Sequence, residues 1–503
     1  MTEPRLAHVE ALLARGTCRR VPVKRELYAD FITPVEALRR LRAASHHCFL
    51  LESAEANEQR GRYTFLGCNP SLEITCTDGR IRVRRNVEGA DPVVETFSVD
   101  HPASAIRAIL AEHQSADLPD FPPFTGGLVG YFSYDYVKYA EPRLRTAAPE
   151  GDFLDADLML FDSVVVFDSF KQKIILVTGV YGNADDPLDS DAVRASYEAA
   201  SARLDVFEHL LKNGPAHDFP PLHLASPLTP RCSKSEYAAM IEAAKTRIRE
   251  GDIFQVVLSN PLSAPAEGSL FDAYRVLRCE NPSPYLFYFT SDDVEIAGAS
   301  PETLVRLQHG RLETYPLAGT RPRGATPAQD AAAEADLLAD EKELAEHNML
   351  VDLGRNDLGR VSVLGSVQVE RYLDVLRFSR VMHLGSTVAS DIDPDKDALD
   401  AIDAVLPAGT LSGAPKLRAC QIIQELEGAP RGIYGGAVGY LDFSGNMDLC
   451  IAIRLAYQKA GVVRVQSGAG IVADSVAENE WHECANKARA VVDALQTAEG
   501  GLA

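Results

Sequence analysis

The sequence predicts an α+β protein in which most of the β-sheet is antiparallel. Runs typical of strands alternate with helical segments, but they lack the regular spacing of the βαβ units in a doubly wound parallel sheet. The clearest of these runs are SVVVFDS from residue 163, KIILVTGV from residue 173, RLETYPLAG from residue 311 and VVRVQSGAGIV from residue 462. Helices between such runs begin at well-formed capping sequences, which supports the same class.

Two helix starts carry complete capping signals. The segment Thr33–Glu36 combines an N-cap hydroxyl, a first-turn proline and a glutamate that can return a hydrogen bond, directly before ALRRLRAA. The segment Ser233–Glu236 repeats this capping box. The helix that it opens is expected to end near Gly251, and IFQVVLS after that glycine predicts a strand.

A proline-rich stretch divides the chain. Residues 213–232 contain five prolines, which exclude a continuous helix or a central strand. We therefore expect an N-terminal region over residues 1–212, a linker over 213–232 and a second region over 233–503. A short sequence occurs in both regions, as GGLVGY from residue 126 and GGAVGY from residue 435. Two strands marked by glycine in this way could pair closely, and chance similarity is the alternative.

Charge and cysteine usage limit the possible functions. The chain has 50 basic and 72 acidic residues and a formal net charge of −22, which repels nucleic acid and anionic membranes. An anionic substrate would therefore need local cations. The nine cysteines form no CxxC pair, so reduced thiols are expected. The sequence has neither the apolar start of a signal peptide nor the ~20 consecutive apolar residues of a membrane span, and we expect a cytoplasmic protein.

Two predicted helices carry glutamates three residues apart. Glu343 and Glu346 lie in ADEKELAEHNMLVDLG, and Glu480 and Glu483 lie in ENEWHECANKARAVVDAL. This spacing places each pair on one helix face. Each pair alone is better explained by an ordinary acidic surface, and Glu483 with Lys487 has the spacing of a surface ion pair. Together, however, the pairs offer four carboxylates, an oxygen donor set that suits Mg²⁺.

Other polar motifs are ambiguous by themselves. The segment GTLSGAPK from residue 409 is not a phosphate loop, because its spacing differs from GxxxxGK and Pro415 removes an amide donor. In QSGAG, residues 466–470, backbone amides at the end of a strand could approach a carboxylate. His383 and Arg454 lie in apolar, strand-like surroundings. Such residues are more often satisfied core residues than catalysts, so their neighbours decide their role.

Read together, these motifs resemble the chorismate-utilising enzyme family over essentially the whole chain. The resemblance is carried by GASPETLV, YPLAGTRPRG, ADEKELAEHNMLVDLGRNDLGRV, FSRVMHLGS, PAGTLSGAPK, YGGAVGY, IAIRLAY, QSGAGIVADS and ENEWHECANKA. In the N-terminal half, FLLESAE and GRYTFLG resemble the regulatory region of the family. The resemblance implies a two-layered, mostly antiparallel β-sheet sandwich flanked by helices.

Two positions indicate a branch of this family. Gln255 stands where water-using members carry a lysine base, and Ala318 in PLAGT stands where others carry a lysine that acts as a covalent amine nucleophile. The resemblance therefore implies the anthranilate-forming branch. This branch converts chorismate and free ammonia into anthranilate and pyruvate with Mg²⁺, as the first step of tryptophan biosynthesis. The alternatives are an aminodeoxychorismate-forming member of the folate pathway and a non-catalytic sensor of tryptophan or chorismate.

The roles of family residues can be carried over to the matching positions. Glu302 is the implied general acid, His383 is implied to assist removal of a ring proton, and Thr410 is implied to orient the substrate. The implied Mg²⁺ ligands are Glu343, Glu346, Glu480 and Glu483. The implied substrate contacts are Gly319, Thr320, Tyr440, Arg454, Gly468, Ala469, Gly470 and Lys487.

The resemblance also implies a partner and an inhibitor. No glutaminase motif is visible, so we expect a separate glutamine amidotransferase subunit that delivers ammonia, and a hetero-oligomer. The region 1–212 is then regulatory, and the region 233–503 binds chorismate. Feedback inhibition by L-tryptophan is implied, at Ser53, Pro284, Tyr285 and Leu286. For NPSPYL, from residue 281, a rigid proline turn is the alternative explanation.

Overall fold

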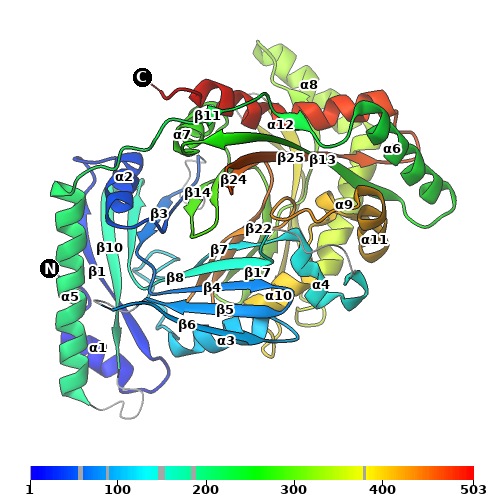
Figure 1. Ribbon diagram of the computed structural model, residues 1–503. Coiled ribbons are helices and arrows are strands. Elements are labelled where there is room, and N and C mark those ends of the chain that lie inside the picture. Colours follow the sequence, from blue (N-terminus) through cyan, green and yellow to red (C-terminus); the bar gives the residue numbers. More distant parts are fainter. Residues whose placement is uncertain are drawn as a thin grey trace.

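Two antiparallel β-sheets form the centre of the computed structural model, with helices around them (Figure 1). The structure describes residues 2–54, 61–86, 90–145, 153–182, 189–377 and 381–502. Neighbouring strands along both sheets run antiparallel. The predicted α+β class with an antiparallel sandwich flanked by helices is therefore confirmed.

The strand orders define the two sheets in the described part of the chain. The first sheet runs β1 (Arg20–Tyr28), β10 (Lys173–Tyr181), β9 (Val164–Asp168), β3 (Tyr63–Cys68), β2 (Cys48–Glu52), β14 (Tyr285–Thr290), β15 (Glu295–Ser300), β24 (Leu455–Lys459), β25 (Val462–Ile471), β13 (Gln255–Glu267) and β11 (His223–Leu224), with β12 (Thr229–Pro230) and β21 (Gly413–Ala414) also on β13. The second runs β18 (Leu317–Pro322), β20 (Val381–Asp391), β17 (Arg311–Thr314), β16 (Thr303–Gln308), β23 (Met447–Ile451), β22 (Ala437–Asp442), β7 (Gly127–Phe132), β8 (Ala156–Phe161), β4 (Leu72–Thr77), β5 (Arg80–Arg85) and β6 (Val93–Ser98), with β19 (Gln368–Arg377) on β20.

Each sheet joins strands from both sides of the proline-rich stretch. In the first sheet β2 pairs with β14, and in the second β7 pairs with β22. The regions 1–212 and 233–503 thus share both sheets edge to edge. Within the stretch 213–232, the short strands β11 and β12 lie against β13.

The two similar hexapeptides form neighbouring strands. β7 and β22 pair so that Gly130 lies directly opposite Gly439. A Cβ atom added at Gly439 would stand 2.1 Å from the carbonyl oxygen of Asp448, and one added at Gly130 would stand 2.0 Å from that of Asp157. Neither position has room for a side chain, so the close pairing expected from the sequence is confirmed.

Helices cover the outer faces of both sheets, while aromatic and aliphatic side chains fill the space between the sheets. The helices are α1 (Leu6–Leu13), α2 (Pro34–Ala44), α3 (Ala103–Glu112), α4 (Val137–Ala140), α5 (Ser190–Asn213), α6 (Lys234–Arg249), α7 (Phe271–Glu280), α8 (Pro327–Ala339), α9 (Glu341–Gly359), α10 (Ala398–Val405), α11 (Lys416–Glu427) and α12 (Ala477–Ala498), with 3-10 turns η1 (Tyr134–Tyr136), η2 (Pro142–Leu144) and η3 (Gly409–Leu411). The predicted capping residues Thr33 and Ser233 do begin α2 and α6. Within the ranges described, no helix is both long enough and apolar enough to cross a membrane.

Candidate active site

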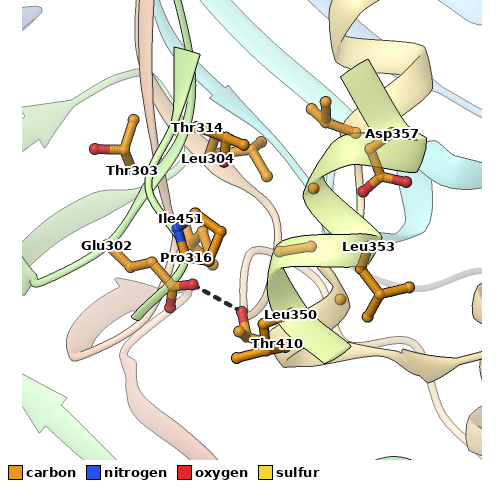
Figure 2. A pocket seen from close by; sticks show the side chains of 14 residues that line it. Glu302, Thr303, Leu304, Thr314, Pro316, Leu350, Leu353, Asp357, Thr410 and Ile451 are labelled. Atoms are coloured by element: carbon orange, nitrogen blue, oxygen red, sulfur yellow. Dashed lines mark hydrogen bonds between the residues drawn. The ribbon is translucent and has the colours of Figure 1, made fainter. Parts of the chain in front are cut away.

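A pocket opens where the second sheet meets α9 and η3. Figure 2 shows Glu302, just before β16, and Thr410, on η3, pointing toward one another across it. Apolar side chains from the sheet and from α9 form most of the wall. The pocket is lined by Glu302, Thr303, Leu304, Thr314, Pro316, Leu350, Leu353, Gly354, Asp357, Val405, Ala408, Gly409, Thr410 and Ile451.

The backbone around Glu302 is fixed by hydrogen bonds to β23. The amide of Ile451 donates to the carbonyl of Glu302 at 3.0 Å, and the Ser300 hydroxyl donates to the carbonyl of Ile451 at 2.7 Å. The Thr410 hydroxyl donates to Oε1 of Glu302 at 3.1 Å. These contacts hold the carboxyl in one place at the edge of the pocket.

Glu302 can carry a proton close to neutral pH. Burial among apolar side chains raises the pKa of its carboxyl to about 7, while the hydrogen bond from Thr410 and the charge of Lys487 act in the opposite direction. A carboxyl with such a pKa can donate a proton to a leaving group at physiological pH. Its position and its pKa both agree with the predicted role of general acid.

His383 lies on β20, opposite Thr320 of β18. Its Nδ1 atom is 3.0 Å from the carbonyl oxygen of Gly319 and 3.0 Å from the Thr320 hydroxyl. Because a carbonyl oxygen only accepts, Nδ1 must carry the hydrogen, and the lone pair of the neutral ring is on Nε2. Burial lowers the pKa of His383, and so does the charge of Arg454, against the opposing effect of the Gly319 carbonyl. The ring is therefore neutral and able to accept a proton.

Gly319 brings β18 against α9. Its φ of +67° favours glycine, and an added Cβ would stand 2.9 Å from Leu337 Cδ1 and 3.3 Å from a carboxylate oxygen of Glu343. The backbone that holds His383 is thus in contact with the helix that carries the first pair of glutamates.

Arg454 supplies a cation without a carboxylate partner. It follows β23 with a positive φ of 54°, and its carbonyl accepts from the amide of Ala299 at 3.0 Å. Burial lowers the pKa of its guanidinium, opposed by Tyr434. In the described part of the chain its side chain makes no ion pair, which leaves its charge available to an anionic ligand.

Tyr434 is a residue that the motifs did not single out. An added Cβ at Gly468 would stand 3.1 Å from the Tyr434 hydroxyl, so this phenol borders Gly468, and it also raises the pKa of Arg454 electrostatically. The predicted Tyr440 lies elsewhere. Its ring packs 4.5 Å from the ring of Phe124, centroid to centroid, in the core between the sheets. Both tyrosines belong to the string YGGAVGY, and we replace Tyr440 by Tyr434 as the candidate substrate contact.

The glycine-rich end of β25 has an open edge. Strand β24 pairs with β25 only from Val462 to Val465, whereas β13 pairs along Gly468, Ala469 and Gly470. Beyond Val465, the side of β25 away from β13 has no strand partner among the described residues. The predicted approach of a carboxylate to backbone amides of Gly468, Ala469 and Gly470 would use this side of the strand.

The two pairs of glutamates approach each other. Burial raises the pKa of Glu346, and the charge of Glu343 on α9 and, more weakly, that of Glu483 on α12 raise it further. Burial also raises the pKa of Glu480, with Glu483 adding to the effect. Repulsion between carboxylates is relieved by a cation, and an all-oxygen donor set of this kind fits Mg²⁺.

Lys487 partly offsets these acidic charges. Its ammonium group is 2.7 Å from the Glu483 carboxylate, and it also opposes the raised pKa values of Glu346 and Glu480. Because it acts on Glu302 as well, Lys487 connects the acidic helices electrostatically to the pocket.

In this structure the four glutamates are near one another without forming a closed set of ligands. Over the described ranges, three ligand atoms lie within 4.8 Å of one another only at His47, Glu73 and Asp292. There, Arg84 already binds both oxygens of Asp292, at 3.0 and 2.9 Å. That cluster is therefore charge-compensated by the protein itself.

The residues predicted to bind an inhibitor are brought together by the pairing of β2 with β14. Leu286 lies opposite Glu52, and the amide of Ala54 donates to the carbonyl of Ser283 at 3.0 Å, which places Ser53 beside the turn that contains Pro284. The Tyr285 hydroxyl donates to Asp448 at 2.8 Å and lies 2.9 Å from the hydroxyl of Thr303. Since Thr303 adjoins Glu302, this segment is in direct contact with the pocket wall.

Comparison with known proteins defines the class. The family model for chorismate binding enzymes matches residues 46–493, and the chain belongs to this family. Its relatives include anthranilate synthase component 1 of Acetivibrio thermocellus, which is 42% identical over 95% of this chain and 96% of the relative. Anthranilate synthase component 1 of Acinetobacter calcoaceticus is 43% identical over 96% of each chain.

Solved structures agree with this assignment. The crystal structure of anthranilate synthase component I from Streptococcus pneumoniae TIGR4 superposes with a TM-score of 0.72 and 39% identity, over 87% of this chain and 93% of the other. The menaquinone-specific isochorismate synthase MenF from Escherichia coli shares the fold, with a TM-score of 0.66, 21% identity and coverage of 98% and 100%.

Removing the Thr410 hydroxyl should change the pH dependence of turnover. Thr410→Val deletes a hydrogen bond that favours ionised Glu302, so the pKa of Glu302 should rise above its starting value of about 7. A general acid works only while protonated, so the fall of kcat/KM on the alkaline side should move to higher pH. The measurement is kcat/KM as a function of pH, calculated from the concentration of un-ionised NH₃. An unchanged alkaline limb would contradict the proposed contact.

Proposed function

We propose that this chain is component I of anthranilate synthase, which converts chorismate and ammonia into anthranilate and pyruvate. The observation that carries the proposal is a half-buried Glu302, held by Thr410 in a pocket, whose pKa of about 7 lets it carry a proton near neutral pH. His383, whose pKa is lowered by burial, and Arg454, which makes no ion pair among the described residues, interact electrostatically and would complete the chemistry. Relatives with more than 40% identity over nearly the whole chain are named anthranilate synthase component 1.

Chorismate is a dicarboxylate, and the site offers donors for both groups. Arg454 and Lys487 supply positive charge, Tyr434 supplies a hydroxyl, and the edge of β25 supplies backbone amides. In a chain with a net charge of −22, these two side chains would supply the local positive charge that an anionic substrate needs. The apolar wall formed by α9 and β16 keeps water from the reacting face.

The first step replaces the ring hydroxyl by an amine. Ammonia attacks ring C2, the double bonds shift, and Glu302 donates its proton to the departing C4 hydroxyl, which leaves as water; the new ammonium group then gives up one proton, which restores the acid form of Glu302. Neither Gln255 nor Ala318 provides a lysine amine, so the nitrogen comes from free ammonia. The product of this step is aminodeoxyisochorismate.

The second step makes the ring aromatic. His383, with its lone pair on Nε2, takes the proton from C2 while the bond between C3 and the enolpyruvyl oxygen breaks. Enolpyruvate leaves and becomes pyruvate, and anthranilate remains. The gain of aromaticity drives this step forward.

The four glutamates on α9 and α12 would hold Mg²⁺. The metal, when bound, supplies positive charge that neutralises the ring carboxylate of chorismate. The support is that burial, together with repulsion from neighbouring glutamates, raises the pKa values of Glu346 and Glu480, and a bound cation would reverse this effect.

The proposal includes a partner and an inhibitor. A separate amidotransferase subunit would deliver ammonia from glutamine, in keeping with the word component in the names of the relatives. L-Tryptophan would bind at the segment formed by Ser53 and Pro284–Leu286 and reach Glu302 through the contact of Tyr285 with Thr303. We place the enzyme in the cytoplasm, where its nine unpaired cysteines remain reduced.

Turnover is tested directly with chorismate, Mg²⁺ and ammonium at mildly alkaline pH. Fluorescent anthranilate and an equal amount of pyruvate are expected. Glu302→Gln should lower kcat by about 10²–10⁴-fold with little change in chorismate binding, because the amide keeps the shape but cannot donate an acidic proton. Release of aminodeoxychorismate without pyruvate would indicate the folate-pathway reaction, and binding without turnover would indicate a sensor.

The metal site is tested on α12. Glu483→Gln should raise the Mg²⁺ concentration for half-maximal activity by about tenfold or more, because one charged ligand is lost. Glu478→Gln is the matched control, since Glu478 is an exposed acid on the same helix that pairs with Lys234 and His482. Equal effects of the two substitutions would remove the reason to place the metal here.

Feedback inhibition is tested at the β2–β14 contact. Ser53→Ala should raise the tryptophan concentration for half inhibition by roughly five- to thirtyfold, because a lost hydrogen bond weakens binding by about 1–2 kcal/mol. Uninhibited turnover should stay near normal. Ser283→Ala is the control, since that hydroxyl donates to the nearby Asn281 carbonyl at 3.1 Å. Unchanged inhibition in Ser53→Ala would count against this pocket.

A further inference from the structure

Arg431 is a fully buried cation behind the pocket, with 1% of its side chain exposed. Its Nε and terminal nitrogens donate to both oxygens of Glu427, at 2.9 and 2.5 Å. Two further donations go to backbone carbonyls, at 2.6 Å to Leu411 and at 2.7 Å to Val257. The guanidinium thus uses four of its five N–H donors on acceptors from three separate elements: α11, η3 and β13.

Glu427 extends the network along the first sheet. Its Oε1 accepts from the amide and the hydroxyl of Ser259 on β13, at 2.7 and 2.8 Å. The amide group of Gln466 on β25 in turn donates to the Ser259 hydroxyl at 2.8 Å. The pair Arg431–Glu427 therefore also fixes the strand that leads into Gly468.

The guanidinium stacks on two tyrosines as well. It lies 4.7 Å from the ring centroid of Tyr134 and 5.7 Å from that of Tyr434. Tyr434 is the phenol that borders Gly468 and raises the pKa of Arg454. The side chain of Arg431 therefore contacts both the loop of Thr410, through the carbonyl of Leu411, and Tyr434, the candidate substrate contact.

We propose that Arg431, held by Glu427, is a positioning residue that sets Thr410 against Glu302 and Tyr434 against Gly468. The inference rests on the proposed function. Stability alone does not explain the arrangement, because burying an ion pair costs desolvation that well-packed apolar side chains avoid. The five N–H donors of a planar guanidinium, however, can hold several groups in one geometry, and the ammonium group of lysine cannot reproduce that geometry.

The proposal predicts a specific change in pH dependence. In Arg431→Lys the loop of Thr410 loses its anchor, the hydrogen bond to Glu302 weakens, and the pKa of Glu302 rises. The alkaline limb of kcat/KM should move to higher pH, in the same direction as for Thr410→Val, and kcat should fall about 10- to 100-fold. The other charges facing Glu302 are unaffected: Lys487 on α12, and Asp357 on α9, which is held by Lys416 at 2.7 Å.

A double-mutant cycle separates positioning from general destabilisation. Arg431→Lys combined with Thr410→Val should show no further shift of the alkaline limb beyond Thr410→Val alone. Arg20→Lys is the matched control, since Arg20 is a fully buried arginine that donates to Ser115 and to the carbonyl of Thr125. Arg20→Lys can lower the free energy of unfolding but should not shift the alkaline limb of kcat/KM. An unshifted limb in Arg431→Lys, or fully additive shifts in the double variant, would overturn the proposal.

Two further measurements cover the cases in which Arg431→Lys does not fold or the wild-type chain is inactive. If Arg431→Lys does not fold, Glu427→Gln keeps the shape of the partner, removes its charge and should give a smaller shift in the same direction. If the wild-type chain makes no anthranilate, the proposed function fails independently. The pKa of Glu302 is then followed by ¹³C NMR of labelled glutamate, assigned by its loss in Glu302→Gln, and it should still rise in Arg431→Lys.

Discussion

Carboxylates of α9 and α12 repel each other, and the proposed Mg²⁺ site depends on that repulsion. Glu346 and Glu480 hold on to protons more strongly than exposed carboxylates do, because they are partly buried beside further glutamates. Lys487 alone cannot neutralise them. The surrounding fold keeps the helices in place: α12 packs on the outer face of the first sheet, and α9 lies against the strands that carry Gly319 and His383. Like charges are thus held where a divalent cation would bind.

The charge states of Arg454 and Glu302 are a second feature that favours binding of an anionic ligand. Arg454, near His383, is a half-buried cation without an ionic partner in the described chain, and Glu302 is an acid that desolvation keeps protonated to about pH 7. Both states are costly without a ligand, and both suit a dianionic substrate that loses a hydroxyl. The neutral His383 completes the set, since it can take a proton only while the nearby cation and its burial keep it uncharged. The site is prepared electrostatically for its reaction before any ligand arrives.

The class of fold followed from the sequence because alternation, capping boxes and irregular strand spacing are local signals. The pairing of Gly130 with Gly439 could also be predicted from the sequence, because both hexapeptides carry glycine at the same position. The sequence did not predict that the two halves share both sheets, because contacts between strands distant in sequence depend on the topology.

At the site, motif matching proposed the acid, the histidine and the glutamates, whose roles remain predictions, and it chose Tyr440 where the structure favours Tyr434. Two tyrosines in one short string differ only in which neighbours they meet after folding. Arg431 lies in a stretch rich in glycine and proline that resembles an exposed turn. Nothing in its sequence surroundings reveals that it is buried against Glu427.

The most direct test of the convergent acidic helices is calorimetric titration of Mg²⁺ into Glu302→Gln, which should bind chorismate but consume it far more slowly than the wild-type chain. The account predicts one Mg²⁺ per chain, tighter binding when chorismate is present, and proton release at mildly acidic pH as Glu346 and Glu480 ionise. Buffers with different ionisation enthalpies report the released protons. Mg²⁺ binding that is indifferent to chorismate and releases no protons would contradict it.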